Sequence, residues 1–292
     1  MIIGVLGPTG SYSEKAAEKW IAKNGGSKVV NLQYYDDIPD TVSAVLDKTI
    51  DLGIIPVENS LEGSVGITLD MLNENDLTIV GEMVVTIKHC LLSKGKLSDI
   101  KIILSHPQAL AQCRQFLKKR FANAEIRTTG STSHAAKLAN EFEEMAAIAS
   151  RESAQMYGLK VLIQDIQDRK ENHTRFIVIK SGSTVKTPSE PEPSVSEKIS
   201  YKTSIIVYLK KDRPGALYEL LGEFAKRGIN LTRIESRPSK RALGDYIFYI
   251  DFEGHTNDEV IIDALDNITS SVGMLKILGS YPQCAMERIT TR

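Results

Sequence analysis

A low-complexity segment at residues 181–200, SGSTVKTPSEPEPSVSEKIS, limits how this chain can fold. It is rich in serine, proline and glutamate, holds three of the ten prolines, and shows no apolar period. A segment of this composition has no hydrophobic face to bury, so it is typical of a linker. The sequence therefore predicts a folded unit at residues 1–180, a linker at 181–200 and a second unit at 201–284.

Short β-branched runs alternate with amphipathic stretches before the linker. The strand candidates are IIGVLG, LGIIPV, LTIVGEMVVTI, KIILS, AEIRTT, AAIAS, LKVLI and RFIVIK. This alternation predicts layers of helices over sheets, an α/β fold. Two strands run into similar polar turns, in DLGIIPVENS and MAAIASRESA, which suggests two related lobes. Ligands collect at the carboxyl ends of strands in open α/β sheets, so a cleft lined by these turns is the expected site.

The unit after the linker has a regular order of elements. Strand patterns occur in TSIIVYLK, INLTRIESRP, DYIFYIDFEG and GMLKILGSYPQ, and helical patterns occur in PGALYELLGEFAKRG and NDEVIIDALDNITSS. In the first helix, Pro214 suits the first helical position, Leu217, Leu220 and Phe224 recur at helical spacing, and Gly228 suits the end. The order βαββαβ predicts a ferredoxin-like domain.

Charge and cysteine usage exclude several classes of protein. Among 292 residues, 36 Lys and Arg nearly balance 37 Asp and Glu, so no net basic field is present to hold nucleic acid or an anionic membrane. Cys90, Cys113 and Cys284 lack the spacing of a zinc site or a disulfide framework. The start MIIGVLGPTGS lacks a basic n-region, and no stretch approaches a membrane span. We expect a cytoplasmic protein.

Two polar segments follow strands in the first unit. In GPTGSYS, Gly7 and Gly10 permit a tight turn whose N–H groups suit an anion. The Gly-Lys-Ser/Thr of a nucleotide loop is missing, and for the motif alone an ordinary strand-to-helix turn is the favoured interpretation. PVENSLEGSVG places Glu58, Asn59 and Ser60 just after an apolar strand. A solvated loop is the simple interpretation, but loops at strand ends often carry function.

Two further segments hold candidate site residues. In SHPQALAQC, Ser105 or His106 suits a helix N-cap before Pro107, whereas Gln112 lies too far into the helix for capping. In ENHTRF, the hydroxyl of Thr174 stands at the start of the strand RFIVIK and can point into a cleft. The simpler interpretation is an ordinary strand residue, with the neighbouring arginine paired to a surface acid.

Taken together, GPTGSYS, PVENSLEGSV, SHPQALAQC and NHTRFIVI, in this order and at these intervals, resemble the catalytic domain of prephenate dehydratases. GALYELL with ESRP resembles the ACT regulatory domain of the same enzymes. The resemblance implies conversion of prephenate to phenylpyruvate, carbon dioxide and water in L-phenylalanine synthesis. It also implies a two-lobed periplasmic-binding-protein-like catalytic domain with its site between the lobes, and no metal or organic cofactor.

The resemblance also implies residue roles. Thr174 would be the catalytic hydroxyl, which donates to the departing oxygen. The implied substrate-binding residues are Thr9, Ser11, Glu58, Asn59, Ser60, Ser105, Gln112, Arg175 and Phe176. Feedback by L-phenylalanine would use a site between paired ACT domains, hence a homodimer or homotetramer. Its implied residues are Gly215, Ala216, Leu217, Asn230, Leu231, Glu235, Ser236, Arg237 and Pro238.

Two other functions remain open from the sequence. Arogenate dehydratase acts on a substrate that carries an amino group in place of the keto oxygen, and these motifs do not separate it from prephenate dehydratase. A non-catalytic sensor would combine the same two domains without turnover, although the intact Thr174, Asn59 and Gln112 argue against it. A nucleic-acid-binding regulator would need a basic surface and a recognition helix, which the sequence does not indicate.

Overall fold

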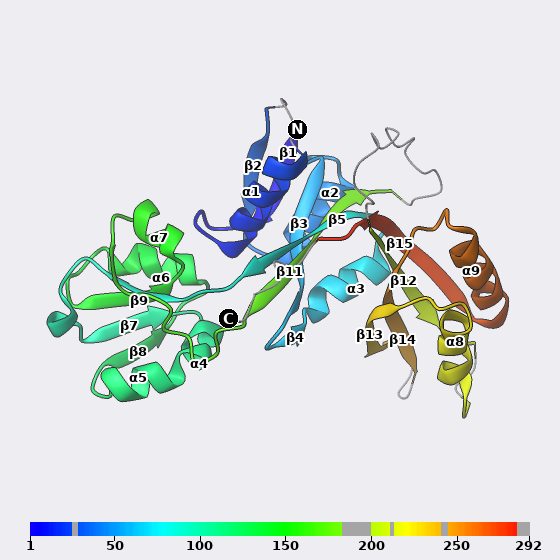
Figure 1. The fold of residues 1–292 in the computed structure, drawn as a ribbon. Helices are drawn as coiled ribbons and strands as arrows, with labels where there is room; N and C mark the ends of the chain where they lie inside the picture. The colour runs from blue at the N-terminus through cyan, green and yellow to red at the C-terminus, as the bar shows by residue number, and fades with distance from the viewer. Residues whose placement is uncertain (25–28, 183–199, 211–212, 241–244, 285–292) are drawn as a thin grey trace.

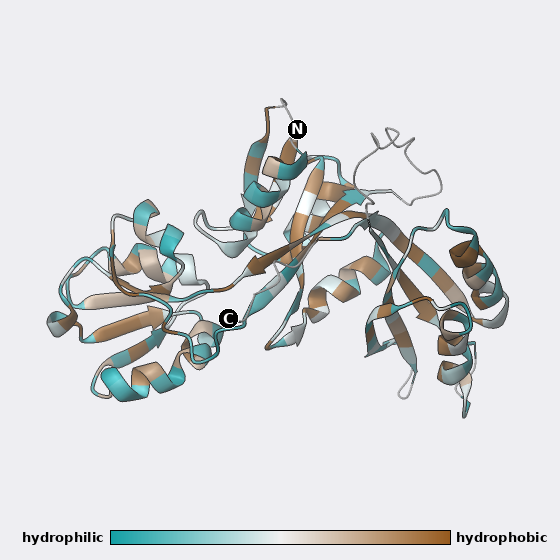
Figure 2. Cartoon of the chain, in the orientation of Figure 1, coloured by the Kyte–Doolittle hydropathy of each residue, from teal (hydrophilic) through white to brown (hydrophobic). Residues whose placement is uncertain are grey.

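The computed structural model describes residues 1–24, 29–182, 200–210, 213–240 and 245–284, which form three α/β units (Figure 1). Most of the predicted linker, residues 183–199, lies outside this described part. None of the helices in the described part is long and apolar enough to cross a membrane. Figure 2 shows hydrophobic residues along the central strands of the sheets and hydrophilic residues on the outward helix faces.

The first lobe is built on a six-stranded sheet in the order β2-β1-β3-β11-β5, with β4 paired to β3. Its strands are β1 (Ile2–Leu6), β2 (Asn31–Tyr35), β3 (Leu52–Asn59), β4 (Gly63–Ser64), β5 (Leu77–Thr86) and β11 (His173–Ser181), and its helices are α1 (Tyr12–Asn24), α2 (Ile38–Leu46) and α3 (Gly66–Glu74). Strand β11 runs antiparallel between β3 and β5. Its apolar run Phe176–Ile179 is buried on both faces, as expected of a central strand covered on both sides.

The second lobe has a five-stranded sheet in the order β10-β6-β9-β7-β8. Its elements are β6 (Cys90–Ser93), η1 (Leu97–Asp99), β7 (Ile102–Ser105), α4 (Pro107–Gln112), α5 (Arg114–Arg120), β8 (Glu125–Thr128), α6 (Thr132–Ala139), β9 (Met145–Ala149), α7 (Arg151–Met156) and β10 (Lys160–Ile163). The chain enters this lobe after β5 and returns to β11 of the first lobe (Figure 1). The predicted α/β fold with two lobes is confirmed.

The C-terminal unit is the predicted βαββαβ domain, with all its strand pairs antiparallel in the order β13-β14-β12-β15. Its elements are β12 (Tyr201–Tyr208), α8 (Ala216–Ala225), β13 (Leu231–Pro238), β14 (Tyr246–Glu253), α9 (Glu259–Ser271) and β15 (Met274–Pro282). The prediction that α8 begins at Pro214 is wrong. The helix begins at Ala216, because Gly215 has a φ of 87° and is its left-handed N-cap.

The C-terminal unit packs its sheet against the first lobe, and the two share one hydrophobic core. Helices α8 and α9 cover one face of the sheet. The other face places Ile206, Tyr249 and Leu278 in the same buried cluster as Leu69 and Ile79 of the first lobe. The Tyr249 hydroxyl donates to the carbonyl of Leu69 at 2.9 Å. Residues on either side of the linker therefore form one continuous packed body.

Candidate active site

The register between β3 and β11 divides two of the sequence motifs between opposite faces of the sheet. Thr174 lies opposite Asn59, and Arg175 lies opposite Glu58. Successive side chains of a strand point to opposite faces, so Thr174 and Arg175 lie on opposite faces of the sheet, as do Asn59 and Glu58. Thr174 and Asn59 face the space between the lobes, whereas Arg175 and Glu58 face the C-terminal unit.

A cavity of about 290 Å³ lies between the two lobes and contains Thr174. The first lobe supplies Leu6, Gly7, Tyr12, Asp36, Asn59 and Thr174, the crossing segments supply Ile87, His89 and Asn172, and the second lobe supplies His106, Gln108, Ala109, Gln112, Gly130, Ser131 and Thr132. Of the substrate-binding residues implied by the resemblance, the structure brings Asn59 and Gln112 to this cavity. It is the size and polarity of a small-metabolite site.

The amide of Asn59 has a fixed orientation that determines the role of the Thr174 hydroxyl. The Asn59 Oδ1 accepts from the backbone N–H groups of Leu61 and Glu62 at 2.9 and 3.1 Å. The Asn59 Nδ2 therefore points the other way, and donates to Thr174 Oγ1 at 2.9 Å. Because the threonine oxygen accepts this hydrogen bond, its own hydrogen is available to be donated to a group in the cavity.

The orientation of the Asn59 amide also fixes donors and acceptors along a row of hydrogen bonds that runs through Asn172 and Gln112 to His89. The Asn59 Nδ2 also donates to Asn172 Oδ1 at 2.8 Å, so Asn172 Nδ2 donates to Gln112 Oε1 at 2.8 Å. Gln112 Oε1 thus acts as an acceptor, and the His89 Nε2 at 2.9 Å must carry the proton. Burial lowers the pKa of His89 and outweighs the opposing effect of the Gln112 hydrogen bond. His89 is therefore neutral, with its proton on Nε2.

Sequence reasoning did not assign His89, Asn172 or Tyr12, although all three line the cavity. The signal for His89 was an imidazole directly before the apolar strand β6. Asn172 stood beside Thr174 in the ENHTRF stretch, but its neighbours gave no reason to choose it. These side chains come from three distant segments of the chain, which only the fold brings together.

Several predicted residues hold the walls of the site. The Ser105 hydroxyl donates to the carbonyl of Ile148 at 2.6 Å, and Ser60 Oγ accepts from the backbone N–H of His173 at 3.0 Å. The N-cap of α4 is His106, whose Nδ1 accepts from the N–H of Gln108 at 3.3 Å. Phe176 is buried in the core of the first lobe.

The GPTGSYS segment makes contacts of a different kind from those expected. The Gly10 N–H donates to the Glu14 carboxylate, and Ser11 Oγ donates to the carbonyl of Leu6 at 2.7 Å. The carbonyl of Thr9 accepts from the Tyr157 hydroxyl of the second lobe at 2.9 Å. Within this structure the segment therefore joins the two lobes, and its Gly10 N–H already has an anionic partner.

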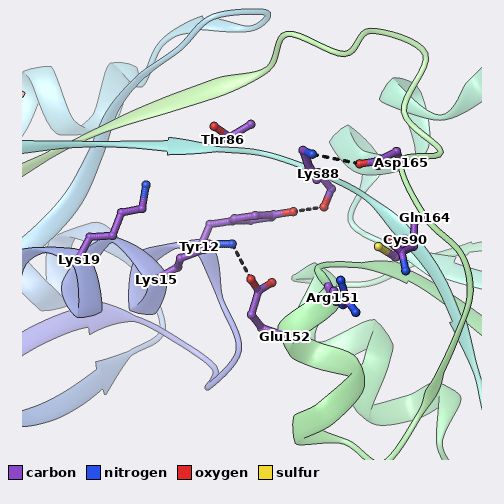
Figure 3. A pocket seen from close by; sticks show the side chains of 10 residues that line it. All are labelled: Tyr12, Lys15, Lys19, Thr86, Lys88, Cys90, Arg151, Glu152, Gln164 and Asp165. Carbon is purple, nitrogen blue, oxygen red and sulfur yellow. Dashed lines mark hydrogen bonds and ion pairs between the residues drawn. The ribbon is translucent and has the colours of Figure 1, made fainter. Parts of the chain in front are cut away.

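A second cavity of about 300 Å³ lies on the other side of the segment that crosses between β5 and β6 (Figure 3). Thr86, Lys88 and Cys90 line it, whereas the intervening Ile87 and His89 line the first cavity. Its opposite charges pair across the lobes, Lys15 with Glu152 at 2.5 Å and Lys88 with Asp165 at 3.6 Å. Burial raises the pKa of the Cys90 thiol, which disfavours the nucleophilic thiolate. This cavity has the character of an interlobe contact.

The predicted effector residues lie in the C-terminal unit. Gly215 caps α8, and Ala216 and Leu217 form its first turn. The others are Asn230, just before β13, and Leu231, Glu235, Ser236, Arg237 and Pro238 within it. Strand β13 is an edge of the sheet, with Ser236 and Pro238 exposed. Arg237 faces the first lobe, where it contacts Asp70 at 3.1 Å.

Comparisons with known proteins agree with this architecture. The family model described as prephenate dehydratase matches residues 3–184, and the ACT domain model matches residues 203–269. A prephenate dehydratase of Methanocaldococcus jannaschii is 44% identical over 278 residues, which cover 94% of this chain and 96% of that protein. The arogenate dehydratase/prephenate dehydratase 2 of Arabidopsis thaliana chloroplasts is 39% identical over 293 residues, covering 96% of this chain and 72% of that protein.

A solved structure shows the same arrangement. The prephenate dehydratase of Arthrobacter aurescens in complex with L-Phe has a TM-score of 0.82 and 34% identity, covering 97% of this chain and 90% of that chain. Fold and site thus define a two-lobed α/β enzyme with a polar interlobe cavity and an attached ACT domain. The chain belongs to the prephenate dehydratase family.

Proposed function

We propose that this chain converts prephenate to phenylpyruvate, carbon dioxide and water, and that L-phenylalanine regulates it through the ACT domain. Family membership over nearly the whole chain supports the reaction. The observation that carries the mechanism is the Asn59-to-Thr174 hydrogen bond, which leaves the threonine hydrogen available to the substrate. Thr174 would then be the group that donates to the departing oxygen.

The reaction requires a hydrogen-bond donor for the departing oxygen and a site shielded from water. It does not require a strong nucleophile. Cleavage of the ring carbon–carboxylate bond releases carbon dioxide, and its electron pair becomes a ring π bond. The electron pair of the carbon–oxygen bond at C4 leaves with the hydroxide, which takes a proton to become water. A threonine hydroxyl is a very weak acid, so Thr174 acts by a hydrogen bond that strengthens as negative charge develops on that oxygen.

The substrate carboxylates require anchors at the far side of the cavity. Gly130, Ser131 and Thr132 line that side, at the N-terminus of α6. N–H groups at a helix N-terminus favour anions. We place the pyruvyl carboxylate there, and we place the departing hydroxyl beside Thr174. The neutral amide row of Asn172 and Gln112 fits a keto oxygen or an amino group, so arogenate remains the second candidate substrate.

The test is the rate of phenylpyruvate formation from prephenate near neutral pH, corrected for spontaneous decomposition. Thr174→Val removes the hydroxyl at nearly constant size, and Thr174→Ser keeps it. We expect the valine variant to lose about 10²-fold or more in kcat, the usual effect of removing a preorganised donor. The serine variant should retain most activity. Equal activity in both variants would exclude Thr174 as the donor, and turnover of arogenate alone would reassign the substrate.

The remaining proposals concern domains, assembly and location. We assign catalysis to residues 1–180, the linker to 181–200 and regulation to 201–284. Two chains would pair through their ACT domains to form the L-phenylalanine site, giving a homodimer or homotetramer. The exposed Ile234, on the edge strand β13, and the exposed Tyr246 on β14 support pairing. We also propose a cytoplasmic location, which cell fractionation would test.

A further inference from the structure

A cluster of buried charges lies where the ACT domain meets the first lobe. Glu82 and Arg175 come from the first lobe, and Lys202 and Asp251 come from the ACT domain. Their side chains are 1%, 12%, 10% and 6% exposed, respectively. Two carboxylates thus face two cations in a site nearly without water. Such a group is tolerated only when every charge is paired.

Arg175 is the centre of this cluster and binds both domains at once. Its Nε donates to Glu82 at 2.7 Å, within the first lobe. One terminal nitrogen donates to Asp251 at 2.5 Å, and the other donates to the Tyr281 hydroxyl at 2.8 Å, both in the ACT domain. Burial alone would lower the pKa of Arg175, but the Asp251 carboxylate raises it well above its usual range. The arginine therefore stays charged. The ACT domain accepts two of its three hydrogen bonds, and Glu58 of the first lobe adds an ion pair at 3.8 Å.

The ACT side of the contact is itself held in place. Ser204 on β12 donates to the other oxygen of Asp251 at 2.5 Å and shares a hydrogen bond with Tyr281 at 2.6 Å. Asp251 and Tyr281 lie on β14 and β15, on either side of β12. A shift of these strands relative to one another would therefore displace the groups that accept hydrogen bonds from the Arg175 guanidinium group.

Arg175 also connects this interdomain contact to the active site. Arg175 is the next residue after Thr174 in β11, and the two side chains leave the strand in opposite directions. The register between β11 and β3 shifts directly after Arg175. The extra residue is Val57 of β3, whereas β11 pairs with β5 in regular register through Thr174, Arg175 and Phe176. A bulge bends the strand that carries it and re-aims the side chains beside it, here Glu58 and Asn59, which lie opposite Arg175 and Thr174. The placement of Thr174 thus depends on what holds Arg175.

We propose that Arg175 is a positioning residue for the reaction, through which Asp251 and Tyr281 of the ACT domain set the placement of the Thr174 hydroxyl. This inference rests on the proposed function. When L-phenylalanine rearranges the ACT sheet, the change reaches the cavity through this guanidinium group rather than through the linker. Arg175 itself does not touch substrate.

Three variants and a control test the proposal. Asp251→Asn keeps the shape of the side chain but removes its charge. Arg175→Lys keeps the charge but removes the planar guanidinium group that binds several acceptors at once. The third variant combines both substitutions. Lys276→Met is the control, because Lys276 also joins the two domains, donating to the carbonyls of Leu72 and Asn75 at the end of α3, but does not touch β11. The measurements are kcat, KM for prephenate, and inhibition by L-phenylalanine.

We expect Arg175→Lys to lower kcat by about 10- to 100-fold with KM changed less than about 3-fold, because misplacing a transition-state donor affects kcat. Asp251→Asn should lower kcat in the same way and reduce the inhibition by L-phenylalanine to less than about half. The double variant should resemble Arg175→Lys, because both changes act on one contact. The control should keep the wild-type kcat and the wild-type inhibition.

Two results would overturn the proposal: multiplicative losses in the double variant, or wild-type inhibition in Asp251→Asn. If Asp251→Asn fails to fold, Tyr281→Phe replaces it, since it removes one bond and no charge. Hydrogen exchange of the peptide containing Thr174 provides a readout independent of turnover. Added L-phenylalanine should change its exchange in wild type and in Lys276→Met, and not in Asp251→Asn. Lack of turnover by the wild type would instead count against the proposed function.

Discussion

At the scale of single residues, the polarity of one amide decides what the site can do. Two backbone N–H groups fix the orientation of the Asn59 amide. That orientation determines which group donates in each hydrogen bond of the row from Asn59 to His89. The sequence motifs pointed to Asn59, Gln112 and Thr174. They did not show that Arg175 and Glu58 face away from the cavity. The pattern of a strand gives the alternation of its side chains, but not which part of the molecule each face of the sheet contacts.

His89 should make the stability of the protein depend on pH. Its pKa in the folded protein is below the ordinary 6.5, so the unfolded chain binds a proton that the folded chain does not. The stability from its neutral form is present above pH 6.5 and is lost as the pH falls below it. His89→Asn should therefore reduce the fall in unfolding free energy between pH 7.5 and about 5.5, by at most about 1.4 kcal/mol per pH unit.

Urea unfolding at several pH values measures this effect. The exposed His134 provides the control as His134→Asn. If both variants follow the wild-type pH dependence, His89 does not titrate as we expect.

At the scale of elements, the sequence predicted types of element better than their ends. The helix expected after Pro107 is divided at Cys113 into α4 and α5, because the backbone of Cys113 leaves the helical region at φ −112° and ψ 18°. The paired strands of the ACT domain followed from their apolar patterns. Their contact with the first lobe did not, because the apolar face of a sheet does not identify what covers it.

Strand β15 approaches β5 so closely that only glycine fits at position 279. A Cβ there would lie 2.2 Å from the carbonyl oxygen of Ile79, and the φ of Gly279 is 148°. Gly279→Ala should lower the unfolding free energy by about 1–3 kcal/mol, measured by urea unfolding. The matched control is Gly222→Ala within α8, where a Cβ meets nothing within 4 Å. It should stabilise by about 0.4–1 kcal/mol. Effects of the same sign would contradict the close approach.

At the scale of the whole molecule, the shared core makes the ACT domain part of the catalytic body, and β13 is the edge strand at which we propose that a second chain pairs. Sedimentation should therefore give a mass of at least two chains of 32.3 kDa. Ile234→Lys, on β13, should lower that mass and weaken inhibition by L-phenylalanine, because a charge at a sheet edge opposes pairing. Ile126→Lys, on the edge strand β8 of the second lobe, is the control. An unchanged mass in Ile234→Lys would place the contact elsewhere.

The common core between the ACT sheet and the first lobe also bears on how this enzyme can evolve. A substitution at that junction that relieves inhibition would at the same time remove packing from the lobe that carries out the chemistry. Lineages under selection for overproduction of L-phenylalanine would therefore lose enzyme abundance if they changed the junction. Escape without that loss is open at the outer surface of the ACT domain, near Gly215 and along the exposed side of β13, where we propose that L-phenylalanine binds. Resistance in such lineages should accumulate where the effector binds, and the junction should remain unchanged.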